Sequence, residues 1–341
     1  MKIIVDAFGG DNAPLEIIKG CAEAVRELDV DIVLTGDEET IRRVAKNHSI
    51  PLHRMEIVST KGVITMEDHP SVVLKEKSDS SMAEGLRLVA EGKGDAFVSA
   101  GNSGALTVGT TMIVKRIKGI KRVAFGAILP TQKGNMLLLD SGANVECRPE
   151  MLHQFGIMGS IYMEKVMGVK NPKIGLANVG EEEHKGSDLY VETHQLLKND
   201  PNLNFVGNVE GRDMPSGVAD LIVADGFTGN MILKTYEGVA LFVLGMVKNV
   251  FYKSTKNKLA AAVIKKDLYD LKKSMDYNET GGAPIMGALK PVFKAHGSAK
   301  ANTVKNAIRL TKEYVSNQVV DIISQSVAQV KSQKEQTAAE H

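Results

Sequence analysis

The chain has 341 residues, of which 43% are hydrophobic, and its formal net charge is +1. This length predicts one large or two medium domains with an ample core, and the near-neutral charge argues against a dedicated nucleic-acid binder. Cys21 and Cys147 stand alone and the eight histidines are scattered, so no zinc-site spacing is present and a reduced, cytoplasmic protein is expected. The opening MKIIVD is typical of a strand rather than of a signal peptide. Lys or Gly interrupts every apolar stretch well before the roughly 18 residues of a membrane-spanning helix, so no such helix is expected.

The N-terminal part alternates between strand and helix patterns. Strands are predicted at residues 2–5, 31–35 and 55–59, and helices at residues 15–28 and 38–47. This order, with short links, is the signature of a parallel, doubly wound α/β sheet. The polar, irregular segment that follows, residues 64–81, is predicted to be a mobile loop beside a cleft.

The alternation continues through the middle of the chain. Further helices are predicted at residues 81–91, 105–118, 149–167 and 187–198, and further strands at residues 95–99, 123–129, 135–139, 173–177, 205–206 and 219–224. A short polar link separates the strands at 123–129 and 135–139, so these two are predicted to pair.

Beyond residue 230 the pattern becomes helical. An apolar helix is predicted at 231–251, a basic amphipathic helix at 256–275, a Gly/Pro loop at 277–287 and a last long helix at 299–326. The tail from Lys331 is polar and expected to fray. We therefore expect a single α/β domain over residues 1–341, with a helical extension at about 231–276.

The segment ADLIVADGFTGNMILK, residues 219–234, combines a buried strand, a tight polar turn and a helix start. Helix N-termini carry unpaired N–H groups and a partial positive charge, so they suit phosphate or an oxyanion. Four other loops repeat this arrangement: DAFGGD (6–11), SAGNSGA (99–105), DSGAN (140–144) and ANVGEEEHKG (177–186). Because strand ends line the ligand crevice of open α/β sheets, these loops are predicted to meet in one anion-binding cleft.

Each loop also has an ordinary structural interpretation. DAFGGD lacks the GxGxxG spacing and fits a plain strand–helix turn. Asn102 and Asp225 fit simple N-caps, and GGAP at 281–284 fits a linker turn. Lys185 lies in a charge run that fits a solvated surface, although its position at a strand end would also let it neutralise phosphate. His184 lacks an identifiable partner carboxylate and is not favoured as a base.

The segment 256–275 places apolar side chains near helical spacing and lysines on the opposite face. Eight Lys and two Asp fall between residues 248 and 273. One interpretation is a surface helix that packs on the core or on a dimer mate. The other is a docking element for an anionic membrane surface or an acidic carrier protein.

Seven motifs occur in order across nearly the whole chain: DAFGGD, SAGNSGA, DSGAN, ANVGEEEHKG, DGFTGN, GGAP and HGSAKAN. In this order the sequence resembles the bacterial phosphate acyltransferases of phospholipid synthesis, the PlsX family. Two positions differ from the usual motifs, with Phe8 in place of Met and Ser103 in place of Thr. The first change stays apolar and the second keeps the hydroxyl, so neither puts activity in doubt.

The resemblance implies a reaction in which inorganic phosphate attacks the thioester of a fatty acyl–acyl carrier protein, releasing acyl phosphate and free carrier protein. It implies a Rossmann-like three-layer α/β/α fold, akin to phosphotransacetylases and isocitrate/isopropylmalate dehydrogenases. A homodimer, peripheral association with the inner face of the membrane and transfer of the acyl phosphate to a membrane glycerol-3-phosphate acyltransferase would accompany it. No metal and no cofactor are expected.

Site residues are assigned on the same basis. Lys185 is expected to provide charge, Asn230 to donate a hydrogen bond, and Asp225 to position groups or assist proton transfer to the thiolate. Residues expected to bind phosphate or substrate are Asp6, Gly9, Gly10, Asp11, Asn102, Ser103, Gly104, Asn144, Thr228, Gly229 and Gly282. Residues expected to contact the membrane or the carrier protein are Leu259, Val263, Lys265, Lys266 and Leu268.

Rival functions remain at this stage. A short-chain phosphotransacetylase that uses coenzyme A would share the fold and differ in its acyl donor. A decarboxylating dehydrogenase would need a carboxylate metal cluster and an Arg-rich site, and Arg116, Arg122 and Arg148 form no evident cluster in the sequence. A non-catalytic, membrane-docked scaffold would bind lipid without consuming thioester.

Overall fold

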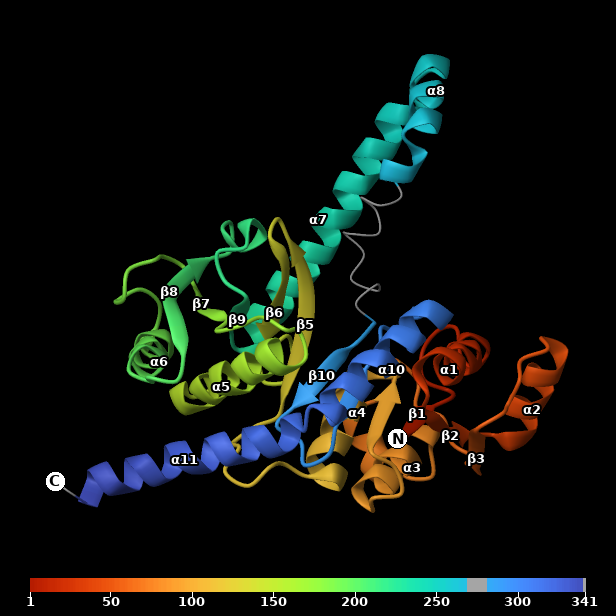
Figure 1. The fold of residues 1–341 in the computed structure, drawn as a ribbon, viewed down its shortest axis with the longest axis horizontal. Coiled ribbons are helices and arrows are strands. Elements are labelled where there is room, and N and C mark those ends of the chain that lie inside the picture. The colour runs from red at the N-terminus through yellow and green to blue at the C-terminus, as the bar shows by residue number, and fades with distance from the viewer. Residues whose placement is uncertain (269–280, 340–341) are drawn as a thin grey trace.

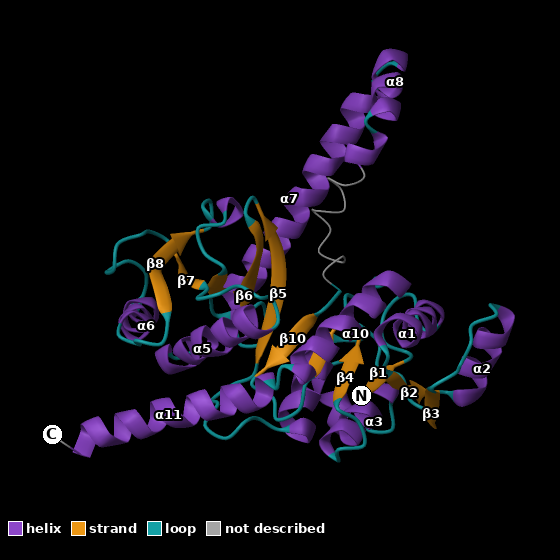
Figure 2. Cartoon of the chain, in the orientation of Figure 1, coloured by secondary structure: helices purple, strands orange, loops and turns teal. Residues whose placement is uncertain are grey.

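The computed structural model describes residues 1–268 and 281–339. Within them, eleven strands form one sheet in the order β3-β2-β1-β4-β11-β10-β5-β6-β9-β7-β8 (Figures 1 and 2). The strands are β1 (Lys2–Asp6), β2 (Asp31–Gly36), β3 (Met55–Ser59), β4 (Ala96–Ser99), β5 (Ala124–Thr131), β6 (Gly134–Leu139), β7 (Lys173–Asn178), β8 (Asn204–Glu210), β9 (Leu221–Val223), β10 (Ala283–Met286) and β11 (Val292–Lys294).

The sheet has two parallel halves that run in opposite directions. Strands β3, β2, β1, β4 and β11 are parallel to one another, and so are β6, β9, β7 and β8. Between the halves, β10 pairs antiparallel with both β11 and β5, and β5 pairs antiparallel with β6. The strand direction therefore switches at the centre of the sheet, which is where open α/β sheets place their ligands.

Helices cover both faces of the sheet. They are α1 (Leu15–Leu28), α2 (Glu38–Asn47), α3 (Ser81–Ala90), α4 (Ser103–Gly109), α5 (Pro149–Lys165), α6 (Asp188–Lys198), α7 (Gly226–Tyr252), α8 (Thr255–Val263), α10 (Ala301–Ser316) and α11 (Val319–Ala339). Strand side chains alternate between faces: Ile3 and Val5 pack in a core shared with α1, α5 and α10, while Ile4 packs on the other face with α3. The three-layer α/β/α fold predicted from the sequence is confirmed.

Helix α7 begins in the core and ends in solvent. Its first turns pack on the sheet, where Ile232, Leu233 and Tyr236 join a core cluster. Beyond them it projects from the body together with α8 (Figure 1), leaving Leu241 70% and Phe242 65% exposed. In length and composition α7 meets the requirements of a membrane-crossing helix, which differs from the expectation that none is present.

The C-terminal third departs most from the prediction. The chain beyond residue 230 is not wholly helical, since β10 and β11 form the centre of the sheet. The predicted helix 299–326 is two helices, because Gln318 takes a φ of 51° between them. The second of them, α11, continues to Ala339 rather than fraying from residue 331.

Two other predicted helices are shorter in the structure or only partly described. The helix predicted at 105–118 ends at Val114 after a π-helical turn at Thr110–Val114. Helix α8 ends at Val263, and the part of the predicted helix 256–275 from residue 269 lies outside the described residues.

A buried hydrogen bond joins α5 to the residues just after α6. His153 Nε2 lies 2.8 Å from the Asp200 carboxylate, and both side chains are buried. Burial raises the pKa of Asp200. Hydrogen bonds from His153 and Asn202 lower it by a larger amount, so the net pKa is below the usual value. The charged carboxylate therefore stabilises the fold above its unfolded-state pKa of about 3.9, and this contribution is lost as pH falls through the folded-state pKa.

We expect Asp200→Asn to lower the free energy of unfolding at pH 7 by about 1–3 kcal/mol. The difference from the wild type should shrink as pH falls below about 4, since the wild type then loses its own carboxylate charge. Denaturant unfolding across pH 2.5–7 measures this, with Glu67→Gln as the control because Glu67 is exposed. A difference that stays constant down to pH 2.5 would show that the pair adds nothing through its charge.

Candidate active site

The first two motif loops are bound to each other through Asp6. This buried carboxylate accepts hydrogen bonds from Ser81 Oγ at 2.6 Å and Ser99 Oγ at 2.7 Å, and burial raises its pKa. A Cβ on Gly9 would lie 2.6 Å from both the Asp6 carboxylate and the Gly101 nitrogen. Asp6 and Gly9 therefore fix the loop, and their expected role in binding phosphate stays a prediction.

The same loop continues to the cleft. Gly10 has a φ of +98°, and a Cβ there would lie 2.8 Å from the Gly297 carbonyl oxygen. The Asp11 backbone N–H donates to that same carbonyl at 2.8 Å, which joins DAFGGD to HGSAKAN. Asp11 itself lines the cleft.

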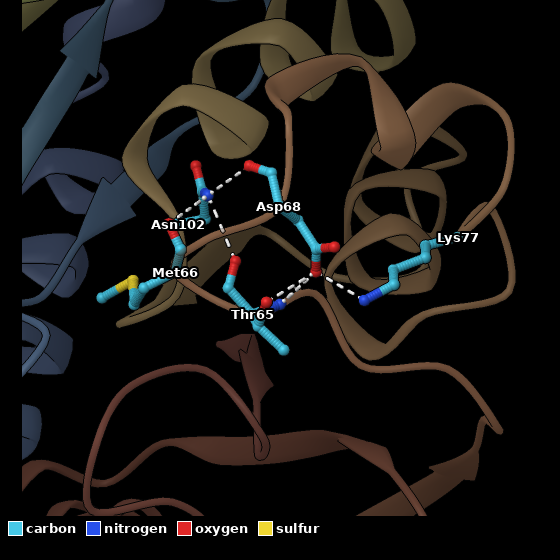
Figure 3. A network of polar contacts seen from close by, with 5 residues as sticks. All are labelled: Thr65, Met66, Asp68, Lys77 and Asn102. Atoms are coloured by element: carbon cyan, nitrogen blue, oxygen red, sulfur yellow. Dashed lines mark hydrogen bonds and ion pairs between the residues drawn. The ribbon is translucent and has the colours of Figure 1, made fainter.

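Asn102 fixes a neighbouring loop, as Figure 3 shows. Its side-chain amide donates to the carbonyl oxygens of Thr65, Met66 and Asp68 at 3.0–3.2 Å, while its Oδ1 accepts from the Ala105 N–H at 3.0 Å. All its hydrogen-bonding groups are thus engaged. Asn102 caps α4 and ties residues 65–68 to it, and its expected hydrogen bond to phosphate or thioester stays a prediction.

The DSGAN loop is organised by a second buried carboxylate, Asp140. It accepts from the backbone N–H groups of Phe125, Ala143 and Asn144. The Asn144 amide donates to this carboxylate at 2.8 Å and to the Val123 carbonyl at 2.7 Å. Asn144 is therefore part of the loop's internal hydrogen bonding, and its expected ligand role stays a prediction.

Asp225 caps α7 and occupies its N-terminus. Its carboxylate accepts from the N–H groups of Phe227 and Thr228, each at 2.9 Å, and from Thr228 Oγ1 at 2.7 Å. The Gly226 N–H donates to the Asn144 carbonyl at 2.7 Å. The first N–H groups of this helix thus all have partners within the chain, and the anion site expected at the start of α7 stays a prediction.

Tyr190 is a neighbour of Asp225 that sequence reasoning missed. Its hydroxyl bonds to the Asp225 carboxylate and lies 2.9 Å from Thr228 Oγ1. Burial, together with the Asp225 bond, raises the pKa of Tyr190 to about 12. Asp225 and Thr228 therefore position the start of α7 and Tyr190, which favours the predicted positioning role of Asp225 over proton transfer.

Two adjoining cavities lie over the switch in strand direction, between the sheet and α7. The larger, about 440 Å³, has among its lining residues Asp11, Ser103, Gly282, Lys294, His296 and Ser298. The smaller, about 330 Å³, includes Ser103, Gly104, Ser141, Gly142, Ala143 and Asn230. Four of the five loops predicted to share a cleft contribute to these linings, and ANVGEEEHKG contributes to neither. GGAP and HGSAKAN, which were not part of that prediction, contribute as well, so six of the seven motif loops line the cavities.

Three basic side chains that the sequence analysis did not single out line the larger cavity: Lys234, Lys294 and His296. Burial and the nearby Lys294 lower the pKa of His296. Burial also lowers the pKa of Lys294 to about 8. In the sequence, Lys294 directly follows a short apolar run, PVF, and stands just before the HGSAKAN motif. This position is the sequence signal that could have identified it. Across the described residues, no group of three or more His, Cys, Asp or Glu side chains is arranged to hold a metal ion.

Lys185 lies outside the lining of both cavities. Its side chain is 41% exposed, with the ammonium 3.9 Å from the Glu182 carboxylate. The Asn178 amide binds the Lys185 carbonyl at 3.0 Å, and the adjacent Gly186 packs against Tyr190. The loop therefore borders the start of α7, and the charge role of Lys185 stays a prediction.

The residues expected to contact a membrane or carrier protein lie on α8 and just after it, at the end of the projecting arm (Figure 1). Leu259, Val263, Lys265 and Lys266 are exposed, and Leu268 is half-buried. They are remote from the cleft, so any role they have concerns docking rather than chemistry.

Comparison with known proteins adds to this geometry. Residues 1–322 match a family model described as fatty acid synthesis protein. The chain is 47% identical over 328 residues to a phosphate acyltransferase of Alkaliphilus oremlandii, covering 96% of this chain and 98% of the relative. It is 48% identical over 326 residues to a phosphate acyltransferase of Acetivibrio thermocellus, covering 95% and 96%.

Solved structures agree at the level of fold. A phosphotransacetylase from Streptococcus pyogenes superposes with a TM-score of 0.62, and the EutD phosphotransacetylase from Staphylococcus aureus with 0.61. Each is 15% identical and covers 92% of this chain and 94% of its own, so this likeness concerns the fold alone. The sequence matches extend over nearly the whole chain, and the protein therefore belongs to the phosphate acyltransferase, or PlsX, family of transferases.

Proposed function

We propose that the enzyme transfers a fatty acyl group from acyl carrier protein to inorganic phosphate, for phospholipid synthesis. A phosphate oxygen attacks the thioester carbonyl carbon, a C–O bond forms, and the C–S bond then breaks. The products are acyl phosphate and the carrier protein's thiolate, which takes up a proton. The observation that carries the proposal is the convergence of six motif loops on a polar cleft with three basic side chains.

Phosphate is already a nucleophile, so the cleft has two tasks: to hold it against the thioester and to stabilise the oxyanion of the tetrahedral intermediate. The Asn230 amide and the Ser103 hydroxyl line the cavities and are suitable donors. Gly104 and Gly282 let a ligand approach the backbone. Lys185, on the loop beside Tyr190, adds positive charge once substrate is bound.

The projecting arm serves association rather than chemistry. The exposed apolar side chains of α7 would be covered in a homodimer, because a helix that buries so little of an apolar surface needs a partner. Leu259, Val263, Lys265, Lys266 and Leu268 would meet the inner face of the cell membrane or the acidic carrier protein. Acyl phosphate formed there would pass to a membrane glycerol-3-phosphate acyltransferase, which fits a cytoplasmic, peripherally bound enzyme.

The reaction is tested by thiol release from palmitoyl–acyl carrier protein with and without phosphate, trapping acyl phosphate with hydroxylamine. We expect thiol and acyl phosphate in equal amounts, and about 100-fold lower kcat/KM for Lys185→Ala, which removes a charge that stabilises the oxyanion. Lys165→Ala is the control, because Lys165 is exposed and pairs with Glu164 at 2.8 Å.

Other outcomes favour other functions. Equal rates with palmitoyl–coenzyme A and palmitoyl–acyl carrier protein would favour the coenzyme A-dependent alternative. Absence of phosphate-dependent thiol release with folded wild type would sink the proposal and leave a docking scaffold as the better account. Full activity of Lys185→Ala would keep the reaction and remove Lys185 from it.

A further inference from the structure

Lys294 lies at the centre of the sheet, where a parallel strand pair meets an antiparallel one. It is the last residue of β11, with Ser99 of the parallel strand β4 on one side and Ala283 of the antiparallel strand β10 on the other. Lys294 is therefore located where the strand direction switches. The residue is only 6% exposed, yet it lines the larger cavity.

The ammonium group is held by two neutral carbonyls. Lys294 Nζ donates to the Ala100 oxygen at 3.1 Å and to the Ala295 oxygen at 2.5 Å. An ammonium has three N–H donors, so one remains for a ligand in the cavity. Because Ala100 belongs to SAGNSGA and Ala295 precedes HGSAKAN, the same two bonds fix the ammonium relative to two cleft loops.

The charge of Lys294 lacks a direct counter-ion. In the part of the chain that the structure describes, no carboxylate lies within 4.0 Å of its ammonium, since it forms none of the ion pairs there. Asp11 and Asp6 act on it from a greater distance, and they partly offset the effects of burial and Lys234 on its pKa. A buried cation held only by neutral groups is costly, and an anion in the cavity would offset that cost.

We propose that Lys294 is the fixed cation of the phosphate site and binds inorganic phosphate through its remaining N–H group. The inference rests on the proposed function, because it gives the nucleophile of that reaction a place in the cleft. Two tasks are then divided between two lysines. Buried Lys294 holds the phosphate, whereas the more exposed Lys185 interacts with the acyl group.

The test is Lys294→Met, which keeps the length and bulk of the side chain and removes the charge. We expect the KM for phosphate to rise at least 30-fold while the KM for palmitoyl–acyl carrier protein changes less than 3-fold. Lys93→Met is the matched control, because Lys93 is exposed, pairs with Glu91 at 2.7 Å and lies before the start of β4. An unchanged KM for phosphate in a folded Lys294→Met protein would overturn the inference.

A second measurement follows phosphate binding to the wild type as pH changes. Phosphate binding to the wild type, followed by titration calorimetry, should weaken at least 10-fold between pH 7 and pH 9.5, because Lys294, with a pKa of about 8, loses its charge over this range. Asp6, Asp11, Lys234 and His296 also face this group, so Lys234→Met is measured alongside. It should still lose phosphate binding as pH rises, but at higher pH, because Lys234 lowers the pKa of Lys294. Phosphate binding that does not change with pH would contradict the role of Lys294.

The two proposals fail separately. Wild type that binds phosphate through Lys294 but forms no acyl phosphate would sink the proposed reaction and leave this inference standing. Wild type that forms acyl phosphate, with a phosphate KM that Lys294→Met does not change, would support the proposed reaction and overturn the role of Lys294.

Discussion

Gly229→Ala should lower the free energy of unfolding by about 3 kcal/mol or more, a large effect for one methyl group. A Cβ at this position would lie 1.8 Å from the Asp140 carbonyl oxygen and 2.9 Å from its carbonyl carbon. Neither the Asp140 backbone nor the start of α7 can easily move to relieve this clash. Asp140 is fixed by its bonds to the DSGAN loop, and the start of α7 is fixed by the Asp225 cap and by the bond from Gly226 to Asn144.

The same helix offers the control. Gly238 has no atom within 4 Å of the position of a Cβ, so Gly238→Ala should raise the free energy of unfolding by about 0.5–1 kcal/mol through helix propensity. Denaturant unfolding of both variants measures the contrast. Equal, small effects would show that the contact of α7 with the DSGAN loop is looser than the structure has it.

The outer parts of the sheet could be predicted from the sequence because their signals are local. Strands β1 and β2 are apolar runs, and α1 and α2 follow them with helical spacing and short links. The central strands β10 and β11 could not be predicted in this way. They have four and three residues and lie among Gly and Pro, and they are strands only because β4 and β5, far away in the chain, pair with them.

The cleft was predicted better than the roles of its side chains. Strand-end loops converge because of sheet topology, and the order of motifs followed from the sequence. Whether a polar side chain faces a ligand or its own loop depends on partners distant in the chain. Asn102 binds residues 65–68, and Asp6 binds Ser81. Lys294 was missed for the same reason, since its burial follows from its place beside β4 and β10.

If the cleft at the switch in strand direction carries out the acyl transfer, removing the Asn230 amide should slow the reaction. Asn230 is the fifth residue of α7, is exposed and lines the smaller cavity. Its amide is near Gly142, where a Cβ would lie 3.6 Å from Asn230 Oδ1. The hydrogen bonds of the α7 cap join Asp225 to Phe227 and Thr228 and do not involve the Asn230 side chain, so truncation should leave the thermal unfolding temperature nearly unchanged.

The measurement is the initial rate of phosphate-dependent thiol release from palmitoyl–acyl carrier protein, for Asn230→Ala against wild type. Asn47→Ala is the control, because Asn47 is exposed at the end of α2. We expect a kcat about 100-fold lower for Asn230→Ala, because one oxyanion donor is removed, and the wild-type rate for the control. A folded Asn230→Ala protein with the wild-type rate would contradict it and move the chemistry out of this cleft.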